Sequence, residues 1–241
     1  MNRFILITRH PADCTELQEK LTPCGITLRP YPVLRLEDVE NDTGWIAVDE
    51  NAGPADRPTW LVMASPRAPE RLVAQCRQRN SEWLLEIPVA VIGNGTAAAS
   101  SEAGLEPDLV GPGTGIELAG ALNTILAEPS TVFYACGHHR RPELPDALEA
   151  AGHTVVPLIV YRMHATPPRE LPPLGPSLDA VVVTSPRATR LYLEGVGGLP
   201  LPCPHWALGP TTRDAARSLG IECLIPPEPS IDSLAEELCR I

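Results

Sequence analysis

The chain has 241 residues, of which 44% are hydrophobic and 20% charged, and its formal net charge is −11. This is the composition of an ordinary globular protein, and the length suits two α/β lobes. A protein that binds duplex DNA or an anionic membrane surface needs an extended basic face, which this charge balance does not supply. We therefore expect neither nucleic acid nor membrane as a partner. An anionic small ligand stays open, because a few arginines in one cleft can dominate the local field.

The cysteines and the apolar runs bear on the compartment. The seven cysteines, at positions 14, 24, 76, 136, 203, 223 and 239, form no C-x-x-C motif. Their odd number and irregular spacing favour reduced thiols in a cytoplasmic protein. The apolar run at 4–7 is typical of a buried strand rather than a signal peptide. No run of 18 apolar residues predicts a membrane span.

The first predicted elements are a buried strand at 4–7, a helix, and a second strand within 26–35. Gly25 stands where the glycine that follows a helix belongs. The helix has apolar residues at core spacing: Leu17, Leu21 and Cys24. The acidic stretch 36–58 shows no clear periodicity. Strand and helix then alternate to the end of the chain, apart from a proline-rich segment at 164–178, which predicts doubly wound parallel sheets with right-handed crossovers.

An internal repeat organises these elements. The strand in 60–68 ends in Ser-Pro-Arg-Ala, and so does the strand in 180–188. The turn at 92–96 matches that at 208–212 with an offset of 116 positions, and this offset holds without a gap for four further pairs. These pairs are Gly104 and Gly220, Thr114 and Ser230, Leu118 and Leu234, and Leu122 and Leu238. Residues 4–35 match 132–162 in the same way, with Gly25 equivalent to Gly152.

The repeat and the linker lengths predict how the units pair. A long linker follows each copy of the first repeat: residues 36–58 follow 4–35, and residues 164–178 follow 132–162. By contrast, the join near residue 130, between the second and third units, is short. We therefore expect one discontinuous lobe from 1–35 plus 172–241 and one continuous lobe from 57–158. Residues 33–56 and 159–171 would form a two-stranded connector.

Hydroxyls and arginines recur where predicted strands end. Ser65-Pro66 and Ser185-Pro186 resemble an N-cap followed by proline at the first helical position. The turns that contain Thr96 and Thr212 also open helices. A helix N-terminus with a free hydroxyl can bind an anion, although most such caps are purely structural. Since parallel sheets bind ligands at their carboxyl edge, we predict that this set contacts substrate: Ser65, Arg67, Thr96, Ser185, Arg187 and Thr212.

Two further basic positions also follow predicted strands. Arg9 follows the first strand, and Arg140 lies in the sequence His-His-Arg-Arg at 138–141. Both are predicted substrate contacts, and the alternatives are a surface arginine and a solvated loop. We predict no metal site, because two adjacent histidines on a loop rarely chelate together. No nucleophile elbow, Walker loop or dinucleotide fingerprint is present.

These motifs, in this order, resemble the uroporphyrinogen-III synthase family along nearly the whole chain. The resemblance rests on Ile7-Thr8-Arg9, Gly25, Pro30 to Pro32, Ala64-Ser65, Ile92-Gly93 with Thr96, Gly137, Leu144, Val160-Tyr161, Thr184-Ser185, and Gly209 with Thr212 and Gly220. It implies two doubly wound lobes joined by two strands, with the active site between them. Two features depart from the family pattern: Ala64-Ser65 stands where Thr-Ser is common, and Thr96 lies in a Gly-Asn-Gly-Thr turn. They weaken the case for Ser65 and Thr96.

The resemblance also implies a reaction. Linear hydroxymethylbilane loses its hydroxyl as water, ring D inverts through a spiro intermediate, and the macrocycle closes to uroporphyrinogen III without a cofactor. Tyr161 matches the family's tyrosine at the connector, where its phenol could protonate the departing hydroxyl, or simply pack. The substrate carries eight carboxylates and is intrinsically reactive, so positioning alone would supply much of the catalysis. We expect a monomer that makes transient contact with the preceding pathway enzyme.

Two alternatives remain open at this point. The same two lobes could form a non-catalytic binding or regulatory module derived from the family, although Tyr161 and both threonines favour an enzyme. A sugar-phosphate or nucleotide enzyme is a weaker alternative, because no acid/base pair is found.

Overall fold

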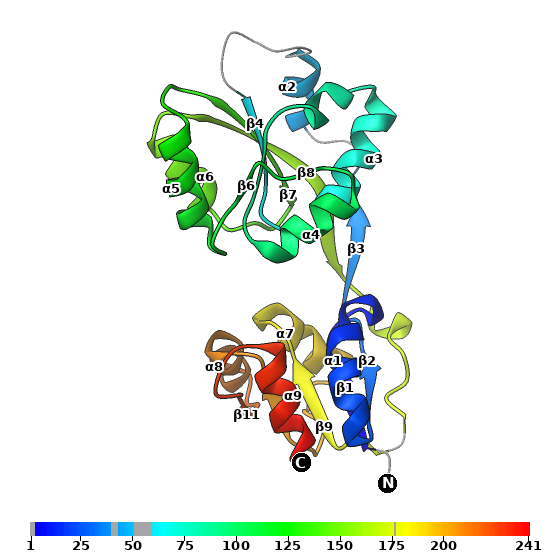
Figure 1. The fold of residues 1–241 in the computed structure, drawn as a ribbon. Coiled ribbons are helices and arrows are strands. Elements are labelled where there is room, and N and C mark those ends of the chain that lie inside the picture. Colours follow the sequence, from blue (N-terminus) through cyan, green and yellow to red (C-terminus); the bar gives the residue numbers. More distant parts are fainter. Residues whose placement is uncertain (1–2, 40–42, 51–58, 176) are drawn as a thin grey trace. The chain divides into compact units, whose positions relative to one another are not determined.

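A computed structural model describes residues 3–39, 43–50, 59–175 and 177–241 (Figure 1). The chain forms two compact units. The terminal unit comprises Met1–Arg35 and His164–Ile241, and the central unit comprises Leu36–Met163. Each unit contains a sheet of mainly parallel strands, which confirms an α/β fold with two parallel-sheet regions. Residues 34–38, at the edge of the central sheet, run antiparallel to their neighbour, because the Val33 carbonyl accepts from the Thr166 N–H whereas the Val39 N–H donates to the Val160 carbonyl.

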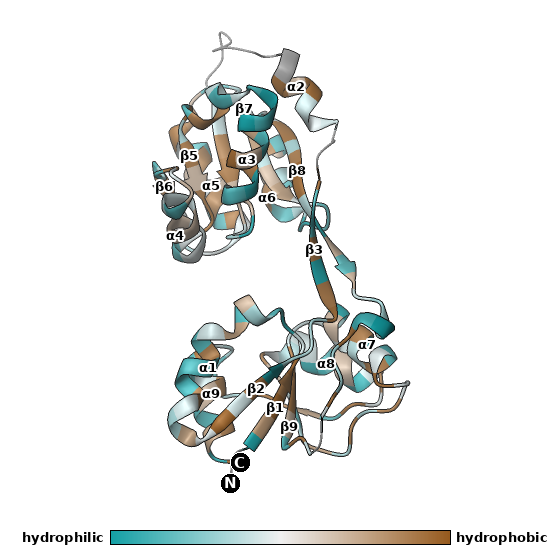
Figure 2. Ribbon diagram, turned by 90° about the vertical axis from the view of Figure 1, so that its right-hand side faces the viewer, coloured by the Kyte–Doolittle hydropathy of each residue, from teal (hydrophilic) through white to brown (hydrophobic). Residues whose placement is uncertain are grey.

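The terminal unit is built on a five-stranded sheet in the order β11-β10-β9-β1-β2. Its strands are β1 (Arg3–Ile7), β2 (Ile26–Pro30), β9 (Ala180–Val183), β10 (His205–Ala207) and β11 (Cys223–Leu224). The inner strands β1 and β9 are mainly hydrophobic (Figure 2), as expected where both faces of a sheet are covered. Ile5 and Val182 pack toward α1 (Thr15–Leu21) and α9 (Ile231–Cys239). Leu6 and Val183 pack toward α7 (Pro186–Gly195) and α8 (Pro210–Ser218).

The central unit is built on a six-stranded sheet in the order β3-β8-β7-β4-β5-β6. Its strands are β3 (Leu34–Asp38), β4 (Thr59–Met63), β5 (Val89–Val91), β6 (Leu109–Val110), β7 (Thr131–Gly137) and β8 (Thr154–Ala165). One face packs against α2 (Gly44–Glu50), α3 (Pro69–Arg79) and α4 (Asn94–Glu102), and the other against α5 (Gly115–Ile125) and α6 (Glu143–Ala150). Short 3-10 helices complete the described elements: Pro11–Cys14, Thr22–Cys24, Glu82–Leu85 and Pro168–Glu170.

The strand registers reproduce the internal repeat. Ile7 pairs with Pro30 in the terminal sheet, and Tyr134 pairs with Pro157 in the central sheet, so both partners shift by the same 127 positions (134 − 7 and 157 − 30). Thr114 and Ser230 each cap a helix by accepting a backbone N–H hydrogen bond. The register of the last strand departs by one residue, because Ala90 pairs with Leu109 whereas Trp206 pairs with Leu224.

The segment predicted to lack periodicity contains regular structure where it is described. Residues 34–38 form β3, next to β8 in the central sheet. Residues 44–50 form α2, and its Trp45 and Val48 are buried in the core of the central unit. Residues 40–42 and 51–58 lie outside the described residues. The apolar residues of this helix form one continuous run, Trp45 to Val48, which shows no helical periodicity, so the sequence did not reveal this helix.

The prediction that all thiols are reduced is wrong for one pair. Cys24 and Cys239 form a disulfide between the 3-10 helix after α1 and the end of α9. The two residues are 215 positions apart in sequence, and the fold brings their Cα atoms to 5.6 Å. No local motif encodes such a pairing, so cysteine spacing could not reveal it. The cysteines therefore no longer support a cytoplasmic location, because disulfides persist mainly in oxidising compartments.

Candidate functional site

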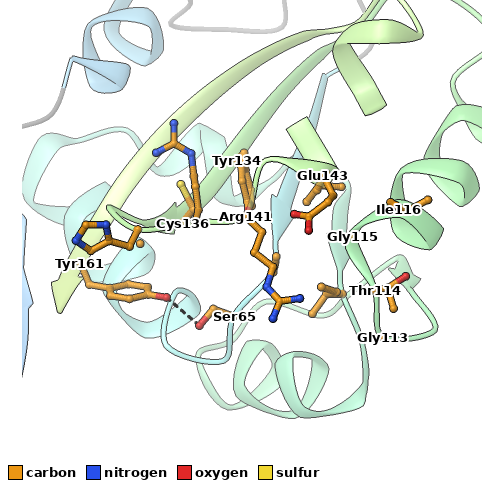
Figure 3. A pocket seen from close by; sticks show the side chains of 16 residues that line it. Ser65, Gly113, Thr114, Gly115, Ile116, Tyr134, Cys136, Arg141, Glu143 and Tyr161 are labelled. Atoms are coloured by element: carbon orange, nitrogen blue, oxygen red, sulfur yellow. Dashed lines mark hydrogen bonds between the residues drawn. The ribbon is translucent and has the colours of Figure 1, made fainter. Parts of the chain in front are cut away.

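A pocket of about 470 Å³ opens at the carboxyl edge of the central sheet (Figure 3). Its floor and walls come from the carboxyl ends of three strands, from one residue within a fourth strand, and from two segments that precede helices. Ala64 and Ser65 follow β4, Ile92 follows β5, Cys136 and Gly137 end β7, and Tyr161 belongs to β8. The start of α5 and the loop that leads into α6 complete the lining. The site therefore lies at the sheet edge where α/β folds bind ligands.

Tyr161 and Ser65 face each other in this pocket. The Tyr161 hydroxyl donates a hydrogen bond to Ser65 Oγ with an O–O distance of 3.0 Å, although the two residues are 96 positions apart in sequence (Figure 3). The Tyr161 side chain is largely buried, with 9% of the residue exposed. Its carbonyl accepts a hydrogen bond from the His138 N–H at 2.9 Å. Both ends of the tyrosine are thus held, while the hydroxyl remains at the pocket wall.

Strand β8 changes register beside β7 at this point. Cys136 pairs with Ile159, but the next residue, Gly137, pairs with Tyr161, so Val160 is skipped. Val160 and Tyr161 consequently contribute to the same core cluster, although they are consecutive in a strand. An irregularity of this kind redirects a side chain, and such bulges are common next to active sites.

Tyr134 forms a second aromatic wall of the pocket. Burial raises its pKa well above the usual value for a phenol, and the nearby Cys136 adds to this effect. Arg140 acts in the opposite direction but is outweighed. Tyr134 is therefore a neutral phenol near pH 7 and cannot serve as a base.

The loop between β7 and α6 brings positive charge to the pocket. Arg140 and Arg141 line it together with His139, and Glu143, at the start of α6, adds one carboxylate to the same lining. The Arg141 side chain extends into the pocket between Tyr134 and Ser65 (Figure 3). Within the described part of the chain, Arg141 makes no hydrogen bond or ion pair, which leaves its guanidinium available to an anionic ligand. In that same part, no three or more His, Cys, Asp or Glu side chains gather to hold a metal ion.

The start of α5 forms the opposite side of the pocket. Thr114 caps this helix: its Oγ accepts the Glu117 N–H at 3.3 Å and donates to the Glu117 carboxylate at 2.6 Å. Ile116, in the first turn, is 63% exposed. An exposed apolar side chain at the edge of a pocket that also contains charged side chains suits a ligand with both apolar and charged parts. The sequence contained a signal for Thr114, because Thr114 is the counterpart of Ser230 in the repeat and both cap a helix.

The predicted catalytic and substrate-binding residues fall into three groups. The pocket brings together Ser65, Arg140 and Tyr161. Arg67 and Thr96 belong to the same unit but do not line this pocket, and Thr96 is only 2% exposed. The remaining four belong to the terminal unit, where they follow the ends of β1, β9 and β10: Arg9, Ser185, Arg187 and Thr212. Missing from the predicted set is Arg141, although it is adjacent to Arg140.

The prediction that Ser65 caps a helix is wrong, whereas that for Ser185 is confirmed. Ser185 Oγ accepts the Ala188 N–H at 3.1 Å, and Pro186 begins α7. Helix α3 begins only at Pro69, because residues 65–68 first form a turn closed by the Ala68 N–H and the Ser65 carbonyl. The second proline of this segment occupies the first helical position. The Ser65 hydroxyl is thereby left for Tyr161.

The sequence is similar to one known family. Residues 15–236 match the family model described as uroporphyrinogen-III synthase HemD. Among curated proteins, none matches the chain. None of the described helices is long and apolar enough to span a membrane.

Two solved structures share the fold. Mutant uroporphyrinogen III synthase from the extremely thermophilic bacterium Thermus thermophilus is 20% identical, with a TM-score of 0.60 over 99% of this chain and 98% of that chain. Uroporphyrinogen-III synthetase from Helicobacter pylori 26695 is 15% identical, with a TM-score of 0.66 over the same shares, 99% and 98%. At these identities the likeness concerns the fold.

Proposed function

Because the chain belongs to the uroporphyrinogen-III synthase HemD family, we propose that it closes hydroxymethylbilane to uroporphyrinogen III and that Tyr161 starts this reaction in the pocket of the central unit. The observation that supports this role is the pair of phenol and serine hydroxyls beside Arg141, which has no partner among the described residues. The family assignment does not favour the alternative of a non-catalytic binding module.

The first step is the departure of the substrate hydroxyl. The bond between the hydroxymethyl carbon and its oxygen breaks, the ring nitrogen supplies the electron pair that forms an azafulvene, and the Tyr161 phenol gives its proton to the departing oxygen, which leaves as water. Ring D then attacks through its substituted carbon to form a spiro intermediate. The bond between this substituted carbon and the methylene bridge to the neighbouring ring then breaks, and the same methylene bonds to the free carbon of ring D. The proton lost from that carbon returns to the phenolate. One water is released, and no cofactor enters the balance.

Substrate binding is the second task of the site. The substrate carries carboxylates on every pyrrole ring, and Arg140 and Arg141 place two permanent positive charges at the pocket. Ile116 and Tyr134 offer apolar surface for the ring itself. We propose that one pyrrole ring occupies the pocket with its carboxylates toward the arginines.

The other predicted residues remain proposals. Arg67 and Thr96 of the central unit, and Arg9, Ser185, Arg187 and Thr212 of the terminal unit, are proposed further substrate contacts. Strands β3 and β8 are the proposed two-stranded connector, supported by hydrogen bonds from the Thr166 N–H to the Val33 carbonyl and from the Val39 N–H to the Val160 carbonyl. We further propose a cyclising lyase that acts as a monomer in transient contact with the preceding pathway enzyme. Its cytoplasmic location is proposed from the biosynthetic family alone, because the cysteines do not support it.

A coupled assay tests this function. Hydroxymethylbilane is supplied to the purified chain, and the I and III isomers of the product are resolved and compared with the spontaneous reaction, which gives the I isomer. The III isomer should dominate, and uroporphyrinogen III should raise the melting temperature while a dinucleotide does not. Product identical to that of the spontaneous reaction would contradict the proposal. Stabilisation by uroporphyrinogen III without catalysis would instead indicate the non-catalytic binding module.

A further inference from the structure

We propose that Gly137 and Ser65 are positioning residues that fix the Tyr161 phenol at the pocket wall, one by leaving space and the other by hydrogen bonding. The inference rests on the proposed function, because it assumes that the phenol acts on substrate. Neither residue needs to touch the reacting atoms for this role.

Gly137 leaves the space that the tyrosine ring occupies. A Cβ atom built on Gly137 would lie 2.6 Å from Cε2 and 2.6 Å from Cζ of Tyr161, and 2.9 Å from its hydroxyl oxygen. Carbon atoms that are not bonded to each other do not approach this closely, so any side chain at 137 must displace the ring. The contact involves the hydroxyl end of the ring, where a shift would matter most for proton transfer.

The register change explains why the glycine must stand at this position. Because Val160 is skipped, Tyr161 lies directly opposite Gly137 in the sheet. The His138 N–H donates to the Tyr161 carbonyl at 2.9 Å and so holds the two strands together next to Gly137. The strands therefore cannot easily move apart to make room for a side chain at 137, and the Tyr161 ring would have to move.

Ser65 acts on the other side of the phenol. Its Oγ accepts the Tyr161 proton at 3.0 Å and also accepts the Arg67 N–H at 3.3 Å, which orients the serine. When the phenol gives its proton to substrate, the Ser65 hydroxyl can turn and donate to the phenolate oxygen. Ser65 would thus both aim the phenol and stabilise the anion that it forms.

The test combines kinetics with a direct probe of the phenol. The chain has four tyrosines, and the other three, Tyr31, Tyr134 and Tyr192, are at most 4% exposed. Because there are only four tyrosines, labelling tyrosine with ¹³C at Cζ gives few NMR signals. The signal that disappears in Tyr161→Phe is that of Tyr161. We expect Gly137→Ala and Ser65→Ala to move the Tyr161 signal.

The kinetic expectations follow from displacement of the phenol. Gly137→Ala should lower kcat about 10- to 100-fold, since misplacing a catalytic group by about 1 Å can cost that much. Ser65→Ala should lower kcat about 2- to 10-fold, the value of one hydrogen bond. Ser65→Thr keeps the hydroxyl and should restore most of the rate. KM should change less than kcat in each case.

Two controls separate positioning from general damage. Gly120→Ala places a Cβ where nothing lies within 4 Å, so it should change neither the signal nor kcat. In a Tyr161→Phe background, Gly137→Ala and Ser65→Ala should cause little further loss of kcat. An unmoved Tyr161 signal in both variants, or an undiminished kcat loss in the Tyr161→Phe background, would overturn the inference. If instead the wild-type chain makes no excess III isomer, the proposed function fails, and the NMR signals still decide the positioning.

Discussion

Leu34 and Tyr161 occupy equivalent positions in the two halves of the chain. Leu34 lies nine positions after Gly25, and Tyr161 lies nine positions after Gly152; each glycine follows a helix. Each residue also lies four positions after a strand proline, Pro30 or Pro157. A leucine side chain cannot donate a proton, so only the copy of the repeat that contains Tyr161 has a phenol at this position. The proposed chemistry is therefore asymmetric although the fold is repeated.

Tyr161→Phe is the first prediction. Removing only the hydroxyl deletes the proposed acid while the ring still fills its place in the core, so the fold should persist. Turnover should fall on the order of 10²-fold, the lower end for a general acid, because the substrate can lose water unaided. Stopped assays with separation of the product isomers measure rate and fidelity together.

The isomer ratio discriminates between roles for Tyr161. A slow variant that still makes pure III isomer supports an acid, and leakage of the I isomer indicates that the phenol mainly holds substrate. Tyr31→Phe in the terminal unit serves as the matched control and should leave both readouts unchanged. Wild-type rate and ratio in Tyr161→Phe would leave the residue a packing role only.

Arg141→Ala is the second prediction. The guanidinium extends into the pocket without a partner among the described residues, so its loss should weaken substrate binding without unfolding the unit. KM should rise about tenfold, in line with one charge-assisted hydrogen bond, and the difference from wild type should shrink at high salt. Arg77→Ala is the matched control, because Arg77 is an exposed arginine of α3 that does not line the pocket. An equal effect of both variants would point to net charge instead of a specific contact.

What the sequence could predict depended on whether its signal was local or repeated. The repeat could be recognised in the sequence because matching glycines and caps recur at a fixed offset, and the strand registers of the two sheets reproduce it. The predicted start of a helix was wrong where two prolines lie close together. Pro66 and Pro69 both suit the first position of a helix, and the sequence does not say which one occupies it. Arg141 was missed for a different reason: on an irregular loop, sequence alone does not say which of two adjacent arginines extends into a pocket.

The Cys24–Cys239 disulfide provides the third prediction. Alkylation of the unfolded chain without reductant should modify five of the seven cysteines, and all seven after reduction. Reduction, or Cys239→Ser, should lower the free energy of unfolding by about 2–4 kcal/mol, since the bond closes a long loop of the unfolded chain. Reductant should no longer shift the melting temperature of the variant. Seven modified cysteines without reductant would show that the thiols are free.

His205 provides the fourth prediction, which concerns pH. Its Nδ1–H donates to the Cys203 carbonyl at 2.8 Å, so Nε2 of the neutral ring accepts from the Tyr192 hydroxyl, also at 2.8 Å. Burial lowers the pKa of His205, and the bond to Cys203 offsets this only in part. The unfolded chain therefore binds a proton more readily, and stability must rise with pH in this range.

The expected pH profile follows from that sign. The contribution of His205 should be fully present above the unfolded pKa of about 6.5 and should be lost as the pH falls through the lower pKa of the folded state. Melting temperatures measured between pH 8 and pH 5 should therefore fall more steeply for wild type than for His205→Gln. Parallel curves for the two proteins would rule out this contribution.

The division of the chain has a consequence for its synthesis on the ribosome. The central unit is continuous, so all its strands have emerged before most of the terminal unit exists. Strand β1 is among the first segments made, yet its neighbour β9 is encoded more than two thirds of the way along the chain. The central unit, which contains Tyr161, can thus fold first. Until β9 is made, the edge of β1 that pairs with β9 has no partner strand. Cys24 waits longest, because its partner is the third residue from the end of the chain.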